Sequence, residues 1–298
     1  MLHRLVDLLC QQQRYDEADQ EIRKLQKQGP LDGDLQRLAV AISLQSQDSV
    51  RAVNIALQTV RDNSMDYRDY LWLGQVLAAA GQTRVSGPSV PAADEAEKQF
   101  RRAVELAPQV PDTWLALVRY LANTQKGSEA DQVIDQARAQ LPKESRTLTL
   151  AACFEAVGQL DRAADEYRRA LNAQPRDPAV LRNVVSFYLR SGKLEEAEPI
   201  LKRLMGEPQP SANGGEANWA RRQLAFILMN RGEYREALAM VGLGFDPTGN
   251  IVEKSPLSHN SAVDSSGKAG DEAVEEMRAR ARALAAFGSH SARDRAIV

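Results

Sequence analysis

Apolar and small residues recur along this chain with the spacing of a helix face, and the whole pattern returns at a nearly constant distance. Seven alanines mark equivalent positions: Ala18, Ala52, Ala96, Ala130, Ala163, Ala197 and Ala237. Neighbouring marker alanines are 33 or 34 residues apart, except across two longer intervals of 44 and 40 residues. Self-similarity at such a period is the signature of a repeat array, so we expect several copies of one helical unit.

The residues around each marker alanine predict two helices joined by a tight turn. An apolar or small residue stands four positions after every marker and, in most units, another stands seven positions after it, which is one face of a helix. Apolar or small pairs thirteen and twelve positions before the marker predict an earlier helix in most units. A glycine five positions before the marker, at Gly158, Gly192 and Gly232, predicts the turn between the two helices.

Prolines and loop-forming segments set the limits of the units. In four units a proline stands twelve positions after the marker and ends the second helix, because proline disfavours helical geometry in the residue before it. The two longer intervals contain TRVSGPSVPAAD at 83–94 and GEPQPSANGGEAN at 206–218. Both segments are dense in residues that favour turns, so we expect them to be loops inserted in the array.

This pattern resembles the tetratricopeptide repeat family, whose unit is two antiparallel helices in 34 residues, with large residues early in the first helix, small residues where helices touch and a closing proline. The fullest match consists of Leu150, Ala151, Phe154, Gly158, Ala163, Tyr167, Ala170 and Pro175. About seven units in register cover most of residues 1–244, although Ser43 stands where a large residue is expected. The resemblance implies an all-α fold, a right-handed α-solenoid of antiparallel helix pairs (a TPR-like superhelix).

The domain organisation that we predict is one array followed by two short segments. The array covers 1–244, with units at about 1–30, 33–65, 67–108, 111–143, 144–177, 178–212 and 218–244. Residues 245–270 show no helical period and many turn formers, which predicts an irregular linker. Residues 271–298 return to a helical pattern, which we interpret as the start of a further, truncated repeat.

The two ends of the array lack the polar capping helix with which solenoids usually close. The sequence starts inside the first helix of a unit and stops on Ala296, Ile297 and Val298. We therefore expect a piece of a longer repeat protein. The alternative is a complete protein whose ends are covered by self-association through Ile297, Val298 and the N-terminal helix.

Composition narrows the classes of partner and compartment. The chain has 298 residues, 43% hydrophobic and 26% charged, with a net charge of −2, so nothing in its charge predicts nucleic acid as a partner. No apolar run is long enough to span a bilayer, so membrane insertion is not expected. Two cysteines in a chain of this length fit a reducing compartment, and we expect a cytoplasmic protein unless an upstream region carries a targeting signal.

No pattern of catalytic or metal-binding residues emerges from the sequence. His3, His259 and His290 are scattered, and Cys10 and Cys153 stand apart from them, so no zinc site is predicted. The Gly-Lys pairs lack the other residues of a phosphate-binding loop. We interpret Cys153 as a small buried side chain and not a reactive thiol. The prediction is a protein without enzymatic activity, cofactor or metal.

The resemblance also implies where a partner binds, because in that family the first helix of each unit lines a concave groove that holds peptides. The corresponding peptide-binding positions are Leu115, Arg119, Asn123, Leu148, Arg182, Ser186, Arg190 and Arg222. Leu71, Gln75, Asp112 and Ala152 align with the same face. Arginines beside leucines suit an extended segment with acidic groups, since guanidinium pairs bidentately with carboxylate. Ordinary solvation explains these arginines at least as well, and the Lys and Asn set with which some members hold a C-terminal carboxylate is absent.

The function that this sequence predicts is a non-catalytic protein–protein interaction scaffold or adaptor, which binds a partner peptide or domain on the concave face of the first helices. Two alternatives stay open. The array is the targeting or regulatory arm of a larger enzyme or sensor, or it is a structural assembly subunit that associates with itself.

Overall fold

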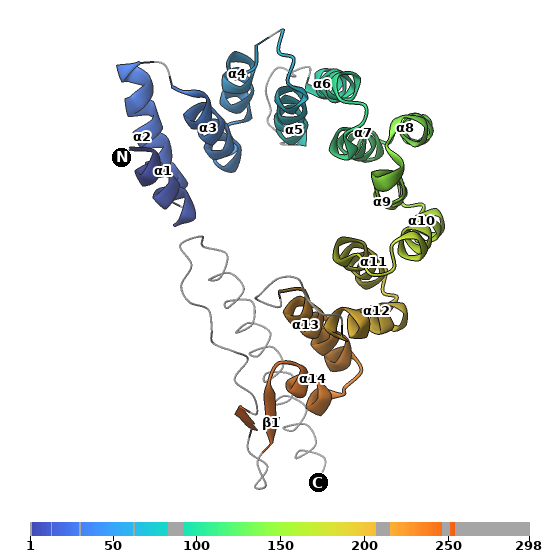
Figure 1. Ribbon diagram of the computed structural model, residues 1–298. Helices are drawn as coiled ribbons and strands as arrows, with labels where there is room; N and C mark the ends of the chain where they lie inside the picture. Colours follow the sequence, from blue (N-terminus) through green and yellow to red (C-terminus); the bar gives the residue numbers. More distant parts are fainter. Residues whose placement is uncertain are drawn as a thin grey trace. The chain divides into compact units, whose positions relative to one another are not determined.

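A computed structural model describes residues 2–12, 14–29, 31–61, 63–82, 92–206, 215–245 and 251–253. These residues form fourteen α-helices and one two-stranded sheet (Figure 1). The chain divides into two compact units, Met1–Glu166 and Tyr167–Val298. Each unit is therefore described by itself below.

The first compact unit contains nine helices and the start of a tenth, which continues into the second unit. The helices are α1 Leu2–Gln11, α2 Tyr15–Gln28, α3 Gly33–Gln45, α4 Ser49–Thr59, α5 Tyr67–Gln82, α6 Ala92–Leu106, α7 Pro111–Asn123, α8 Gly127–Gln140, α9 Lys143–Ala156 and α10 Leu160–Ala173. Odd-numbered helices are the first and even-numbered helices the second members of successive pairs. First helices also contact one another, α3 with α5, α5 with α7, and α7 with α9.

The second compact unit continues the alternation with two further pairs and ends in a short hairpin. Its elements are α11 Pro178–Arg190, α12 Leu194–Gly206, α13 Gly215–Asn230, α14 Tyr234–Met240, β1 Leu243–Phe245 and β2 Ile251–Glu253. In both units the elements are antiparallel helix pairs stacked on one another, which confirms the prediction of an all-α solenoid.

The sequence-based prediction is wrong in two details. The segment 245–270 is not irregular throughout, because β1 and β2 pair antiparallel with Leu243 opposite Glu253; the β-branched Ile251 and Val252 favour a strand there. The rest of that segment and the whole of 271–298 lie outside the described residues. The two insertions are also shorter than predicted, since α6 starts at Ala92 and α13 at Gly215, and acidic residues in both first turns favour a helix start.

The marker alanines lie in the core between packed helices. All seven have 0% of their surface exposed to solvent. The residue four positions after each marker is buried as well, and these residues are Ile22, Ala56, Phe100, Ile134, Tyr167, Leu201 and Val241. A methyl group at each marker position leaves room for large neighbours such as Phe154 beside it. One pair cannot bury these faces alone, so within each compact unit the stacked pairs share a core.

A left-handed backbone residue forms the turn inside the pairs. The position five residues before the marker has a positive φ in five pairs, namely Gln47 (59°), Gln125 (61°), Gly158 (75°), Gly192 (72°) and Gly232 (81°). Only glycine adopts this region without steric cost. The glycine turns predicted from the sequence are confirmed, and two pairs tolerate glutamine at the same place.

The second pair departs from the family pattern at Ser43, and the structure explains how the polar residue is accommodated. Ser43 is buried, and its hydroxyl donates a hydrogen bond of 2.8 Å to the carbonyl of Ala39 in the preceding turn of α3. The hydroxyl is therefore satisfied within its own helix and does not need a partner across the core.

Within each compact unit, polar contacts join neighbouring pairs at close to the repeat distance. The partners of these contacts are 28 to 33 residues apart in the sequence. They are Asp19–Arg51, Arg37–Asp69, Glu97–Lys126, Arg101–Glu129, Asp131–Gln159 and Glu198–Arg231. Residues one repeat apart are neighbours in a stack, so the same side chains that are distant in sequence meet in space.

The left-handed turn gives a first stability prediction. A Cβ added to Gly158 meets no atom within 4 Å, so Gly158→Ala introduces backbone strain without a clash. We expect the free energy of unfolding to fall by about 1 kcal/mol. Gly127→Ala is the matched control, because its added Cβ is equally unobstructed and its φ is not positive; it is expected to be neutral or stabilising. Urea denaturation followed by circular dichroism measures both, and equal effects of the two substitutions would contradict the prediction.

Close packing at the marker alanines gives a second stability prediction. Ala130→Leu forces three carbon atoms into a fully enclosed position of α8, and we expect a loss of about 1–3 kcal/mol. Ala139→Leu places the same atoms on the exposed side of the same helix and should change stability by less than about 0.5 kcal/mol. Thermal unfolding of the two variants provides the comparison.

Candidate functional site

The eight predicted peptide-binding residues all lie on first helices, with four in each compact unit. Leu115, Arg119 and Asn123 are on α7, Leu148 is on α9, Arg182, Ser186 and Arg190 are on α11, and Arg222 is on α13. Each is exposed or half-buried, and none belongs to the core. We call the exposed sides of α3, α5, α7 and α9 in the first unit, and of α11 and α13 in the second, the first-helix face.

Helix α7 presents its candidate residues because its opposite side is fixed in the core. Trp114, Leu117, Val118 and Leu121 are buried, and the Trp114 indole donates a hydrogen bond of 2.7 Å from Nε1 to the Pro108 carbonyl. Positions four apart share a helix face, so the series that begins at Leu115 points away from that core.

A cleft of about 500 Å³ opens between α5 and α7. Small side chains, among them Ala78, Ala79 and Ala116, line part of it, and they leave space where larger residues would fill the gap. The cleft also contains Arg119 and Asn123, which were predicted, and Gln75, which aligned with the same face. The structure thus brings two of the eight predicted residues together with a third from the neighbouring pair.

Two aromatic side chains form the base of this cleft. Phe100 and Tyr120 are buried, and their ring centroids are 5.3 Å apart with the planes tilted by 42°. Phe100 also packs against α5 so closely that a Cβ on Gly74 would lie 2.9 Å from its ring. Burial raises the pKa of Tyr120, so its phenol is neutral at physiological pH. The base is therefore aromatic and uncharged.

Most polar side chains at the rim of the cleft form no hydrogen bond with the described part of the protein. Among the residues that the structure describes, Gln75, Arg119 and Asn123 form no hydrogen bond or ion pair through their side chains. Thr124 differs, because its hydroxyl donates to the Tyr120 carbonyl at 2.9 Å. One guanidinium and two amides consequently face the cleft with their hydrogen-bonding capacity available.

The candidate arginines of the second unit, unlike Arg119, already interact with other groups. The Arg182 Nε lies 3.0 Å from Oε2 of Glu216, and the guanidinium stacks 4.9 Å from the centroid of the Trp219 ring. Arg190 and Arg222 also interact with other groups. Sequence reasoning missed Glu216 and Trp219, although Glu216 stands 34 residues after Arg182, one repeat further on.

Cys153 behaves as the sequence predicted. It has no solvent-exposed surface, and burial raises the pKa of its thiol to about 12, with the nearby positive charge of Arg119 acting in the opposite direction. The thiol therefore stays protonated at neutral pH and is a core side chain. Neither it nor Cys10 forms a disulfide.

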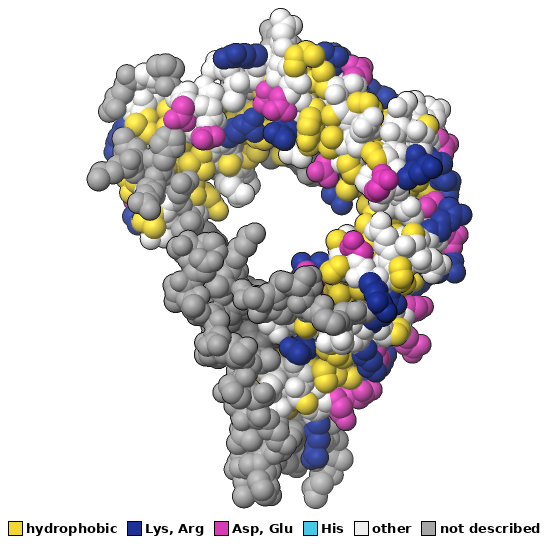
Figure 2. All heavy atoms as spheres, viewed as in Figure 1, with side chains coloured by type: hydrophobic (Ala, Val, Ile, Leu, Met, Phe, Trp, Pro, Cys, Tyr) yellow, Lys and Arg dark blue, Asp and Glu magenta, His cyan; other side chains and the backbone are white. Residues whose placement is uncertain are grey.

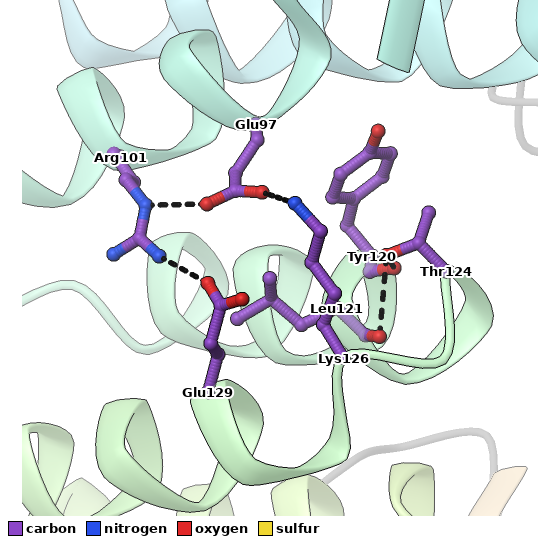
Figure 3. A network of polar contacts seen from close by, with 7 residues as sticks. All are labelled: Glu97, Arg101, Tyr120, Leu121, Thr124, Lys126 and Glu129. Carbon is purple, nitrogen blue, oxygen red and sulfur yellow. Dashed lines mark hydrogen bonds and ion pairs between the residues drawn. The ribbon is translucent and has the colours of Figure 1, made fainter. Parts of the chain in front are cut away.

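A cluster of charged side chains, shown in Figure 3, joins α6 to the turn before α8 and to α8 itself. The Glu97 carboxylate accepts a hydrogen bond of 2.7 Å from the Arg101 Nε and another of 2.7 Å from the Lys126 Nζ. Arg101 donates in turn to Glu129 at 3.2 Å. Burial alone would raise the pKa of Glu97, but the two cationic donors outweigh it and hold the pKa below 4.5. The charges of this cluster satisfy one another, so we interpret it as a structural tie.

Within the described ranges, no group of three or more His, Cys, Asp or Glu side chains is placed to hold a metal ion. No described helix is both long enough and apolar enough to cross a membrane. Figure 2 shows Lys and Arg side chains interspersed with Asp and Glu over the described part of the face that it presents.

Several known proteins are similar to parts of this chain. Residues 155–214 match the family model described as Tetratricopeptide repeat. Cellulose synthase operon protein C of Pseudomonas fluorescens (strain SBW25) is 28% identical over 127 residues, which are 40% of this chain and 10% of that relative. Among solved structures, a thermophilic TPR protein of Thermus thermophilus is 21% identical over 62% of this chain and 96% of its own (TM-score 0.40). Another, from Parabacteroides merdae ATCC 43184, is 13% identical over 80% of this chain and 89% of its own (TM-score 0.45).

The Glu97 cluster yields a prediction of pH dependence. Because the folded-state pKa of Glu97 is lowered, its contribution to stability is present above pH 4.5 and is lost as the pH falls through the folded-state value. At pH 7 the chain should be more stable than its Glu97→Gln variant by about 1 kcal/mol, since both cationic partners remain partly in water. Urea unfolding at a series of pH values should show this difference shrinking below pH 4.5.

Glu105→Gln is the control for this experiment. Glu105 pairs with Arg102 at 2.9 Å on the exposed surface of α6, where ion pairs contribute little. A difference between the wild type and Glu97→Gln that stays constant down to pH 3 would contradict the assignment.

Proposed function

We propose that this chain, whose residues 155–214 match a tetratricopeptide repeat model, is a protein-interaction scaffold whose first-helix face holds a partner peptide or domain. The proposal includes no catalytic step. The cytoplasm remains the proposed compartment, since two cysteines in a chain of 298 residues fit a reducing environment.

The cleft between α5 and α7 is the observation that carries this proposal. It is a concave, mostly apolar site of about 500 Å³ with a few polar groups at its rim, which is the usual form of a recognition site. On the second helices, Arg51 of α4 pairs with Asp19 of α2. At the cleft, by contrast, the side chains of Gln75, Arg119 and Asn123 have no such partner among the described residues. Unsatisfied hydrogen-bonding groups thus favour the first-helix face as the binding surface.

In this proposal the two compact units contribute different binding residues. Leu115 and Leu148, half-buried on α7 and α9, supply apolar contact beside Arg119 and Asn123 in the first unit. Arg182, Ser186, Arg190 and Arg222 supply a second set. Arg182 would have to exchange its bond to Glu216 for a carboxylate of the partner, so we expect this set to bind more weakly.

A second candidate function is that of a targeting or regulatory arm within a longer protein. The observation that favours it is the comparison with cellulose synthase operon protein C, of which the match spans 10%. A scaffold role of the first-helix face is compatible with this candidate. Self-association has one supporting feature, the exposure of Leu5 and Leu8 on α1, whereas Ile297 and Val298 lie outside the described residues.

The location of the binding face can be tested by removing apolar contacts from it. We expect the purified chain to enrich a peptide consensus from a randomised dodecapeptide library, and the double variant Leu115→Ser, Leu148→Ser to lose that enrichment. The matched control is Val50→Ser, Leu57→Ser, which removes two exposed apolar side chains from the second helix α4 and should leave the enrichment unchanged. Circular dichroism confirms that both variants remain folded. Equal enrichment by all three proteins would place the binding surface elsewhere.

A further inference from the structure

The cleft between α5 and α7 has an electrostatic character that points to one class of ligand group. Arg119 is the one charged residue among the described residues that line it, and no carboxylate of the described residues pairs with it. Gln75 approaches from α5 and Asn123 stands one turn beyond Arg119 on α7, so two amides flank the guanidinium. The site therefore presents a positive charge and several hydrogen-bond donors to whatever enters.

We infer that this cleft binds an acidic side chain, Asp or Glu, of an extended peptide, with an adjoining apolar side chain over Phe100 and Tyr120. This inference rests on the proposed function of the first-helix face and specifies the ligand chemistry there. The carboxylate pairs with Arg119, since the planar guanidinium can donate two parallel hydrogen bonds to its two oxygens. Gln75 and Asn123 donate to the carboxylate or to the peptide backbone.

The size and base of the cleft account for the apolar neighbour. A volume of about 500 Å³ exceeds the need of one carboxylate. The remaining space lies against the buried aromatic pair of Phe100 and Tyr120, which offers contact to an aliphatic or aromatic side chain but no charge. A dipeptide of one acidic and one apolar residue therefore suits the site, with the acidic side chain at Arg119 and the apolar side chain over Phe100 and Tyr120.

Two related anionic groups fit less well. A phosphorylated side chain carries close to two negative charges, whereas the described lining supplies one positive charge. A C-terminal carboxylate would require the peptide to stop in the cleft. The first-helix face continues on both sides of it, however, through α3 and α5 and through α7 and α9. An internal acidic side chain lets the segment run on across these helices.

Two other arginines on first helices do not offer the same site. Arg182 already has a carboxylate partner in Glu216 and an aromatic partner in Trp219. The positive charge of Arg37 is likewise engaged, because its Nη2 donates to Asp69 at 2.9 Å and it stacks over Trp72. Arg119 is distinguished from both by lacking an anion among the described residues.

The inference is tested with a randomised dodecapeptide library that is acetylated at the N-terminus and amidated at the C-terminus, so that side chains are the only source of carboxylates. The wild-type chain should enrich peptides with Asp or Glu next to an apolar residue. Arg119→Gln should bind the strongest such peptide about tenfold more weakly, as expected for the loss of a charge-assisted contact. Arg119→Glu should exchange the acidic preference for Lys or Arg at that position.

Arg61→Glu is the matched control, because Arg61 is an exposed arginine after α4 whose side chain forms no ion pair with the described residues; it should keep the wild-type preference. Enriched peptides without an acidic residue, or an acidic preference that survives Arg119→Gln, would overturn the inference and leave the proposed function standing. Enrichment that appears only in a second library with free C-termini would also overturn it. If the wild type enriches no peptide from either library, the proposed function fails together with the inference.

Discussion

The close approach of helices at the marker alanines is the constraint on which the rest of this structure depends. Each marker is completely enclosed, and each is followed one turn later by another buried side chain. A helix pair of about thirty residues has too little apolar surface to fold by itself, so each pair gains its stability from the next. Two helices can pack closely only where the side chains between them are small. The regular spacing of alanine in the sequence therefore sets the regular spacing of the helix pairs in the fold.

Stacking at a constant interval divides the polar side chains into two groups. Residues that stand about one repeat apart become neighbours, and where their charges are opposite they pair, as Glu97 does with Lys126. Where no opposite charge stands one repeat away, the side chain keeps its hydrogen-bonding capacity, as Arg119 does among the described residues. The residue one unit before or after therefore decides whether a side chain is tied into the fold or keeps its hydrogen-bonding capacity.

Arg119 and Arg182 show what the presence or absence of an opposite charge one repeat away means for the proposed binding site. Both are arginines on first helices, and the sequence pattern predicts both as peptide-binding residues. Glu216 neutralises Arg182, while α5 presents Gln75 and a row of small residues to Arg119 and leaves a cleft beside it. Arg182 is part of the folded framework, whereas Arg119 is the group to which we assign carboxylate binding in the proposed site.

The sequence by itself determined the helix pairs, the enclosed alanines, the turn glycines and the burial of Cys153, because these follow from local spacing and from a period that repeats. It also selected Arg119 and Asn123 as members of an outward-facing set. It did not reveal the strand at Ile251–Glu253, since three residues carry too short a pattern. Nor could it separate the open arginine from the paired one, or detect the cleft over Phe100 and Tyr120. Those features depend on side chains about thirty residues apart and on the space left between helices, and only tertiary packing brings such groups together.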